Sequence, residues 1–210
     1  MKPASFEYFA PTSLDEAIAL LSQHGEDAKV LAGGQSLVPL MNMRLARPGV
    51  IVDLNRVSGL DYVREHDGGL AFGAITRQRV AERSDLVRAR NPLLAEAIPF
   101  IGHTAIRNRG TVGGSIAHAD PASELPAVAA ALDAEMVIRG PEGERVATPD
   151  EFFLGYLTTA IEPTEILTEV RFPAWPAGAG WCFLELSRRH GDFAIVGLGV
   201  MVVMGSNGSV

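Results

Sequence analysis

The sequence has a single cysteine, Cys182, among its 210 residues. One thiol cannot form a disulfide within the chain, and it cannot by itself hold an iron–sulfur cluster, which takes about four cysteine ligands. If electrons pass through such clusters, partner proteins therefore carry them. The five histidines lack the His-x-x-x-His spacing that directs two ligands at one ion, and no metal site is predicted.

Long apolar runs and an excess of positive charge are also missing. The most apolar stretch, residues 194–204, is too short to cross a bilayer and is interrupted by Gly197 and Gly199, so it predicts a buried strand. The net charge of −7 argues against a general nucleic-acid binder, which needs a basic face. Because no apolar signal segment follows the start, we expect a cytoplasmic protein without a transmembrane segment.

Two common glycine patterns of nucleotide-binding proteins, Gly-x-Gly-x-x-Gly and Gly-x-x-x-x-Gly-Lys-Ser/Thr, are absent. Instead, two Gly-Gly segments each end in a serine: residues 32–36, Ala-Gly-Gly-Gln-Ser, and residues 111–115, Thr-Val-Gly-Gly-Ser. Glycine lets a ligand approach the backbone, and it reaches the positive φ at which successive N–H groups converge on an anion. A lone Gly-Gly is more often an ordinary turn. The pair predicts a long diphosphate held between the two segments.

The predicted elements mix helices with strands, which indicates an α/β (α+β) fold. Capping residues and apolar spacing predict helices at 13–25, 76–83, 91–100 and 123–132, with a short helix between 31 and 50. Thr76 is expected to cap the second of them. Residues 101–115 hold too many glycine and polar residues for a regular element, and we expect an ordered loop there. Strands are predicted at 29–31, 50–54, 62–64, 70–72, 136–138, 144–146, 166–172, 181–187 and 194–204.

Three motifs, residues 31–39, 106–115 and 152–156, resemble the FAD-binding medium subunit of molybdenum hydroxylases. This family includes carbon monoxide dehydrogenase, xanthine dehydrogenase and bacterial aldehyde or nicotinate hydroxylases. The resemblance covers essentially the whole chain and implies a two-subdomain FAD-binding domain of the vanillyl-alcohol-oxidase or PCMH type. The implied parts are an N-terminal α/β subdomain, a second α/β subdomain and the start of a C-terminal domain, at residues 1–57, 58–175 and 176–210.

Family members usually continue further, so the resemblance also implies that the C-terminal domain is truncated. Residues 205–210 are then expected to form a hairpin turn that leads to a missing strand. This would leave residues 195–204 as an unpaired apolar edge.

The resemblance implies an FAD cofactor and the residues around it. The two Gly-Gly segments would wrap the diphosphate and ribityl chain with N–H and hydroxyl donors, while Ile101 and Gly102 would pack near the adenine. Glu124 would accept hydrogen bonds from cofactor hydroxyls, Asp120 would support the same wall, and Ile161 would lie against the isoalloxazine ring. The full predicted set is Ala32, Gly33, Gly34, Gln35, Ser36, Leu37, Ile101, Gly102, Thr111, Val112, Gly113, Gly114, Ser115, Asp120, Glu124 and Ile161.

Other interpretations of these residues stay open. Ile161 is equally explained by core packing, and Glu124 by a first-turn carboxylate that interacts with a helix dipole. Arg107 and Arg109 could offset phosphate charge, or they could serve structure and subunit contacts. The segment 188–192 lies where the family places a loop near the flavin, although a plain hairpin loop explains it as well.

The resemblance implies an electron-transfer subunit without a catalytic residue of its own. A large molybdopterin-containing subunit would hydroxylate the substrate, and a small iron–sulfur subunit would pass electrons to FAD. An external acceptor, such as a quinone or NAD, would then take them. Two alternatives remain: a stand-alone FAD-dependent oxidoreductase that acts directly on a small molecule, and a non-catalytic scaffold of the same fold.

Overall fold

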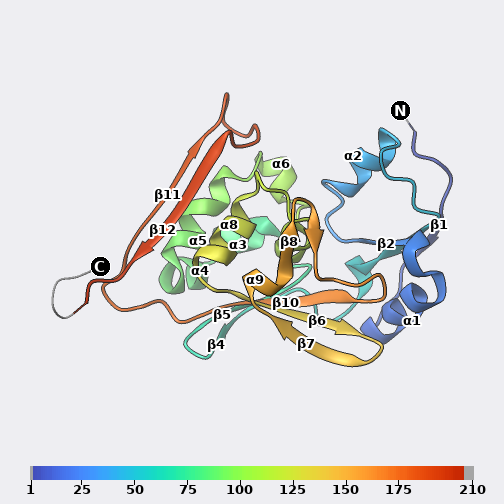
Figure 1. The fold of residues 1–210 in the computed structure, drawn as a ribbon, viewed down its shortest axis with the longest axis horizontal. Coiled ribbons are helices and arrows are strands. Elements are labelled where there is room, and N and C mark those ends of the chain that lie inside the picture. Colours follow the sequence, from blue (N-terminus) through green and yellow to red (C-terminus); the bar gives the residue numbers. More distant parts are fainter. Residues whose placement is uncertain (1, 206–210) are drawn as a thin grey trace.

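The computed structural model of the chain describes residues 2–205. The predicted turn at 205–210 lies largely outside the described residues. The N-terminal part is a three-stranded parallel sheet of order β1-β3-β2 (Figure 1). Its elements are β1 (Glu7–Phe9), α1 (Leu14–His24), η1 (Gly25–Asp27), β2 (Ala28–Leu31), α2 (Leu37–Asn42), β3 (Val50–Asp53) and η2 (Leu54–Arg56).

Helix α1 begins and ends where the sequence predicts. The Ser13 hydroxyl accepts a hydrogen bond from the Glu16 N–H at 3.2 Å, which is the N-cap interaction expected from this serine. Gly25 follows the helix with a φ of 54° that glycine tolerates. The helix buries Ala17, Ile18 and Leu21 in a small hydrophobic core that it forms with β2 and β3.

A second, five-stranded sheet is antiparallel and has the order β4-β5-β10-β6-β7. Both hairpins predicted from the sequence, β4–β5 and β6–β7, are confirmed. The predicted strand at 166–172 is also confirmed, and its place between β5 and β6 explains why almost all of its residues are buried. The strands are β4 (Val63–His66), β5 (Gly69–Gly73), β6 (Glu135–Gly140), β7 (Gly143–Ala147) and β10 (Ile166–Phe172).

Helices cover one side of this sheet and enclose the larger hydrophobic core (Figure 1). The rings of Phe72 on β5 and Phe172 on β10 meet edge to face with centroids 5.8 Å apart. The elements of this layer are α3 (Gln78–Arg83), α4 (Asp85–Arg90), α5 (Pro92–Ala97), η3 (Ile98–Phe100), α6 (Thr104–Arg107), α7 (Val112–His118), α8 (Glu124–Ala131) and α9 (Pro149–Phe152).

Two predictions for this layer are wrong. Thr76 does not cap α3, because its hydroxyl donates to the carbonyl of Tyr62 at 2.8 Å and ties the helix to the entry of β4. The stretch 101–115 is not an irregular loop. It forms α6 and the first turns of α7, since the Thr111 hydroxyl caps α7 by accepting from the Gly114 N–H at 3.0 Å.

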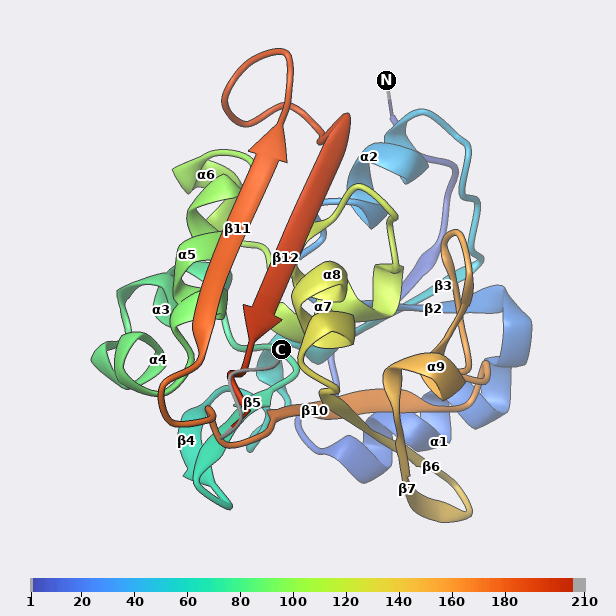
Figure 2. The same ribbon diagram turned by 60° about the vertical axis from the view of Figure 1, so that its left-hand side comes forward.

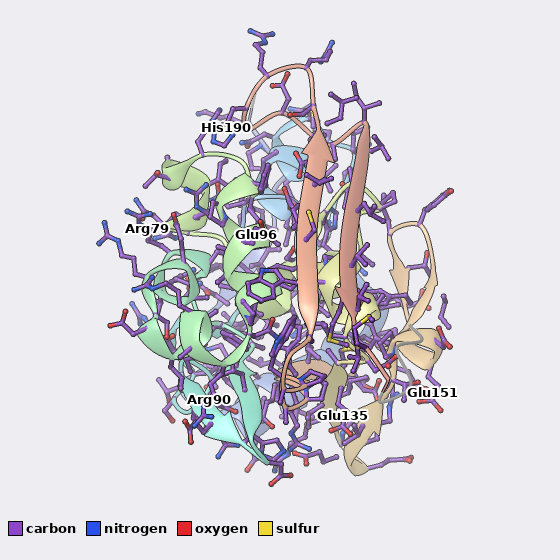
Figure 3. All side chains as sticks on the ribbon, turned by 90° about the vertical axis from the view of Figure 1, so that its left-hand side faces the viewer. Arg79, Arg90, Glu96, Glu135, Glu151 and His190 are labelled. Carbon is purple, nitrogen blue, oxygen red and sulfur yellow. The ribbon has the colours of Figure 1, made fainter. Side chains whose placement is uncertain are left out.

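The last described elements form a separate hairpin of β11 (Gly180–Leu186) and β12 (Val196–Val202), which lies across α5 and α8 (Figure 2). Glu96 of α5 accepts a hydrogen bond from the Phe183 N–H at 3.0 Å, and Figure 3 shows Glu96 beside β11. A small hairpin of β8 (Phe153–Gly155) and β9 (Thr158–Thr159) lies next to α7. None of the helices in the described part of the chain combines the length and apolarity that crossing a membrane requires.

Candidate functional site

The two Gly-Gly segments lie side by side although they are far apart in the sequence. A Cβ atom added to Gly33 would overlap the carbonyl oxygen of Arg109 and lie 2.8 Å from Cα of Gly110. A Cβ atom added to Gly114 would lie 3.7 Å from Cβ of Ala32. We call residues 32–36 the first glycine segment and residues 109–115 the second glycine segment. Glycine at position 33 is required because the two backbones touch there.

The first glycine segment presents unused backbone donors. Gly34 has a φ of 72°, as expected for a turn in which consecutive N–H groups converge. Within residues 2–205, the N–H groups of Gly33, Gly34, Gln35 and Ser36 donate to no protein acceptor. Gly33 is buried, and a buried N–H without a partner is costly unless a ligand or water accepts from it. This segment therefore fits an anionic ligand.

The second glycine segment does not present its amides in the way the sequence suggests. Gly113 and Gly114 are not among the positive-φ residues, and the Gly113 N–H donates to the Ala74 carbonyl at 2.9 Å. A Cβ atom on Gly113 would lie 2.6 Å from Cα of Ala74, so this glycine allows α7 to pack against the end of β5. These amides already have acceptors within the protein, so the structure does not show converging free N–H groups here, and contact of this segment with a cofactor stays a prediction.

The second segment still contributes hydroxyl groups. The hydroxyl of Ser115 has no hydrogen-bond partner among the described residues and is half-exposed. Thr111 is buried, and its hydroxyl accepts from the Gly114 N–H. Ser115 is therefore the residue of this segment with a free donor for a ligand bound between the two segments.

Ile101 and Gly102, predicted near the adenine, are held by the side chain of Arg107. Its Nη1 atom donates to the Ile101 carbonyl at 2.8 Å and to the Gly102 carbonyl at 3.3 Å. Its Nε atom donates to Glu82 at 2.8 Å, and this contact lowers the pKa of Glu82. Arg107 is buried, so the structure favours the structural interpretation of this arginine, whereas Arg109 is exposed.

Asp120 lies on the connection from α7 to α8, and Glu124 is the first residue of α8. Asp120 accepts from the Ala122 N–H at 2.9 Å, and its Oδ2 atom is 3.9 Å from Nε2 of His118. The pKa of Glu124 is raised to about 7, first by burial and then by the nearby carboxyl groups of Glu185 and Asp120. Glu124 is thus a carboxyl group that can hold a proton near neutral pH.

The sequence analysis missed Glu185, although strand alternation could have revealed it. Glu185 follows the buried Phe183 by two residues on β11, and alternation places both side chains on the face toward the helices. Burial raises the pKa of Glu185, and the neighbouring carboxyl group of Glu124 acts in the opposite direction. A charged residue on the inner face of an otherwise apolar strand is the signal that was available.

Ile161 follows β9 and is partly buried against the larger hydrophobic core. Core packing is therefore part of its role, and contact with a cofactor ring remains a prediction. The loop between β11 and β12 approaches the start of α6, since a Cβ atom on Gly191 would overlap the His103 ring. Figure 3 shows His190 at the side of this loop.

Comparison with known proteins identifies an FAD-binding domain. The protein family described as "FAD binding domain in molybdopterin dehydrogenase" matches residues 4–175. Caffeine dehydrogenase subunit beta of Pseudomonas sp. (strain CBB1) is 45% identical over 203 residues, which is 96% of this chain and 69% of that protein. The 6-hydroxypseudooxynicotine dehydrogenase complex subunit alpha of Paenarthrobacter nicotinovorans is 46% identical over 208 residues, covering 99% of this chain and 70% of that protein.

The fold is also found among solved structures. Carbon monoxide dehydrogenase from Hydrogenophaga pseudoflava, in a form that lacks the Mo-pyranopterin moiety of the molybdenum cofactor, matches with a TM-score of 0.93 at 46% identity. The match covers 96% of this chain and 70% of that chain. The resemblance drawn from the three sequence motifs and the expected FAD-binding fold are both confirmed.

Proposed function

The chain belongs to the family of FAD-binding domains in molybdopterin dehydrogenases, and from this premise we propose that it is the electron-transfer subunit of a molybdenum-containing hydroxylase or dehydrogenase. The observation that carries the proposal is the first glycine segment, with its unused N–H groups next to the second segment. Backbone donors of this kind suit a diphosphate, which is the most highly charged part of FAD.

The residues of the chain would divide the binding of FAD between them. The N–H groups of Gly33, Gly34 and Gln35 would donate to diphosphate oxygens, and the Ser115 hydroxyl would donate from the opposite segment. Glu124 would accept from cofactor hydroxyls. We propose that Ile101 and Gly102 flank the adenine, and that Ile161 lies against the flavin ring.

FAD would supply the ability to take electrons one at a time and to release them in pairs. We propose that a small iron–sulfur subunit delivers these electrons and that a large molybdopterin-containing subunit selects and hydroxylates the substrate. The single cysteine of this chain cannot ligate a cluster, which supports the assignment of the clusters to a partner. An external acceptor would take the electrons from FAD.

The experiment that tests the proposal is purification of the protein with whatever subunits accompany it, followed by an absorption spectrum and identification of the released cofactor. The expected result is flavin absorption, with FAD released on denaturation, and companion subunits that contain iron and molybdenum. Protein that is colourless and takes up no FAD would favour the scaffold alternative. Oxidation of an organic substrate by the isolated chain would favour the stand-alone oxidoreductase.

A further inference from the structure

The side chains of Asn55 and Arg77 connect the two glycine segments through hydrogen bonds to backbone carbonyl groups. Asn55, in η2 directly after β3, donates from Nδ2 to the Ala32 carbonyl at 2.9 Å. Its Oδ1 atom accepts from Nη2 of Arg77 at 2.5 Å. The Nη1 atom of Arg77 donates to the Arg109 carbonyl at 2.5 Å. A continuous chain of hydrogen bonds therefore runs from the first segment to the second through Asn55 and Arg77, which we call the clasp.

Each member of the clasp is itself held in place. The Asp53 side chain accepts from both the backbone and the side-chain nitrogen of Asn55, and Asp53 in turn accepts from the Tyr8 hydroxyl at 2.5 Å. Arg77 forms an isolated β-bridge with Thr111, which places its side chain alongside the second segment. Asn55 and Arg77 are both half-buried. The clasp therefore joins the end of the small sheet to the start of α3.

The contact between Asn55 and Ala32 fixes the direction of a ligand donor. In a trans peptide the C=O and the following N–H point in opposite directions. The Ala32 carbonyl points at Asn55, so the Gly33 N–H points away from the clasp, and this N–H donates to no acceptor among residues 2–205. Rotation of this peptide would bring a carbonyl oxygen to the place where an anion is expected.

The contact between Arg77 and Arg109 fixes the separation of the segments. The Arg109 carbonyl lies against Gly33, so closely that a Cβ atom there would overlap it. The guanidinium group donates to this oxygen, and its planar set of donors reaches Asn55 at the same time. A lysine carries the charge but cannot donate along two fixed directions.

We propose that Asn55 and Arg77 are positioning residues for the cofactor, which orient the Gly33 N–H and set the spacing of the two glycine segments. The inference rests on the proposed function, because it assumes that FAD binds between these segments. Neither residue contacts the ligand in this arrangement, and both act through the backbone groups that they hold.

The test compares the variants Asn55→Ala, Arg77→Lys and Arg77→Gln with the unmodified protein, after its FAD has been removed and then titrated back. The matched control is Arg139→Gln. Arg139 on β6 pairs with Asp15 on α1 at 2.9 Å, so it also connects the N-terminal part to the large sheet, but it has no hydrogen bond to either glycine segment. Flavin fluorescence gives the dissociation constant, and thermal unfolding of the FAD-free protein gives the stability.

We expect each clasp variant to bind FAD about tenfold more weakly, the loss of roughly one hydrogen bond's contribution. The double variant Asn55→Ala with Arg77→Gln should bind FAD as tightly as whichever single variant has the lower affinity, because either change interrupts the same chain of hydrogen bonds. Arg139→Gln should bind FAD as the unmodified protein does. Arg77→Lys should not restore binding, because the two-directional donor is lost.

A second readout separates positioning from a general loss of structure. At saturating FAD, amide hydrogen exchange at residues 33–36 should be slow in the unmodified protein and faster in the clasp variants, with exchange in β5 and β10 unchanged. If Arg77→Gln does not fold, FAD titration and hydrogen exchange of Asn55→Ala and Arg77→Lys test the proposal instead. If these two variants bind FAD as tightly as Arg139→Gln does, the clasp has no positioning role. If the unmodified protein takes up no FAD, the proposed function itself fails.

Discussion

Glu124 at the start of α8 and Glu185 on β11 are close enough for each carboxyl group to shift the pKa of the other. Two carboxylates in such proximity repel, and one proton shared between them removes the repulsion. Asp120 adds negative charge on the side of Glu124, and His190 lies on the side of Glu185. The contact joins the helical layer to the C-terminal hairpin.

This pair predicts that stability falls as pH rises through the weakly acidic range. The pKa of Glu124 is raised from 4.5 to about 7, so the folded protein holds a proton that the unfolded chain releases. The stabilisation is complete below pH 4.5 and is lost as pH approaches 7. Glu124→Gln, which stays neutral, should flatten this dependence. Urea unfolding midpoints measured across the window check it.

The matched control for this pH dependence is Glu144→Gln, because Glu144 is exposed on β7. This variant should keep the slope of the unmodified protein. An unchanged slope in Glu124→Gln would show that the carboxyl pair does not control the pH dependence.

Gly33→Ala is predicted to weaken both FAD binding and folding. The added methyl group would overlap the Arg109 carbonyl and force the two glycine segments apart, which costs about 1–3 kcal/mol for an overpacked site. Gly155→Ala is the control, since no atom lies within 4 Å of a Cβ at that position. FAD titration and thermal unfolding of both variants measure the effect. Equal behaviour of the two would contradict the close contact of the segments.

Ser115→Ala is predicted to separate ligand binding from stability. The hydroxyl has no partner within the described residues, so its removal should leave the unfolding free energy of the FAD-free protein unchanged. FAD affinity should fall about three- to tenfold, as for one lost hydrogen bond. Equilibrium titration with FAD checks the affinity. Unaltered binding would remove Ser115 from the proposed site.

Arg107→Gln is predicted to destabilise the fold rather than to act on the cofactor alone. The side chain is buried, and its loss leaves the carbonyls of Ile101 and Gly102 without this donor and leaves Glu82 with only Arg79 as an ion-pair partner. We expect a loss of about 2–3 kcal/mol. Urea denaturation measures it, with Arg109→Gln as the exposed control. A variant as stable as that control would contradict the structural role of Arg107.

Local signals in the sequence predicted the elements of the fold better than their arrangement. Ser13 and Asn91 cap helices where expected, because an N-cap depends on residues three positions away. The helix α4 (Asp85–Arg90) and the strand β1 (Glu7–Phe9) were missed. The central place of β10 between β5 and β6 depends on contacts across about half of the chain, which no local pattern encodes.

For the candidate site, the sequence predicted that the two segments lie together but did not predict the role of each residue in them. The sequence indicated that the two Gly-Gly segments act together, and the structure brings them into contact. It did not reveal that Gly113 serves helix packing, because the two uses of glycine look the same in a sequence. Asn55, Arg77 and Glu185 were missed because their importance arises from partners that the fold brings to them.

The two glycine segments belong to different parts of the molecule, the first to the edge of the small parallel sheet and the second to the helices over the large sheet. A cofactor bound between them would therefore contact both parts, so that their two hydrophobic cores unfold cooperatively. Its contribution to the free energy of unfolding would grow with the logarithm of the free FAD concentration. The supply of flavin would therefore set the fraction of the subunit that is folded.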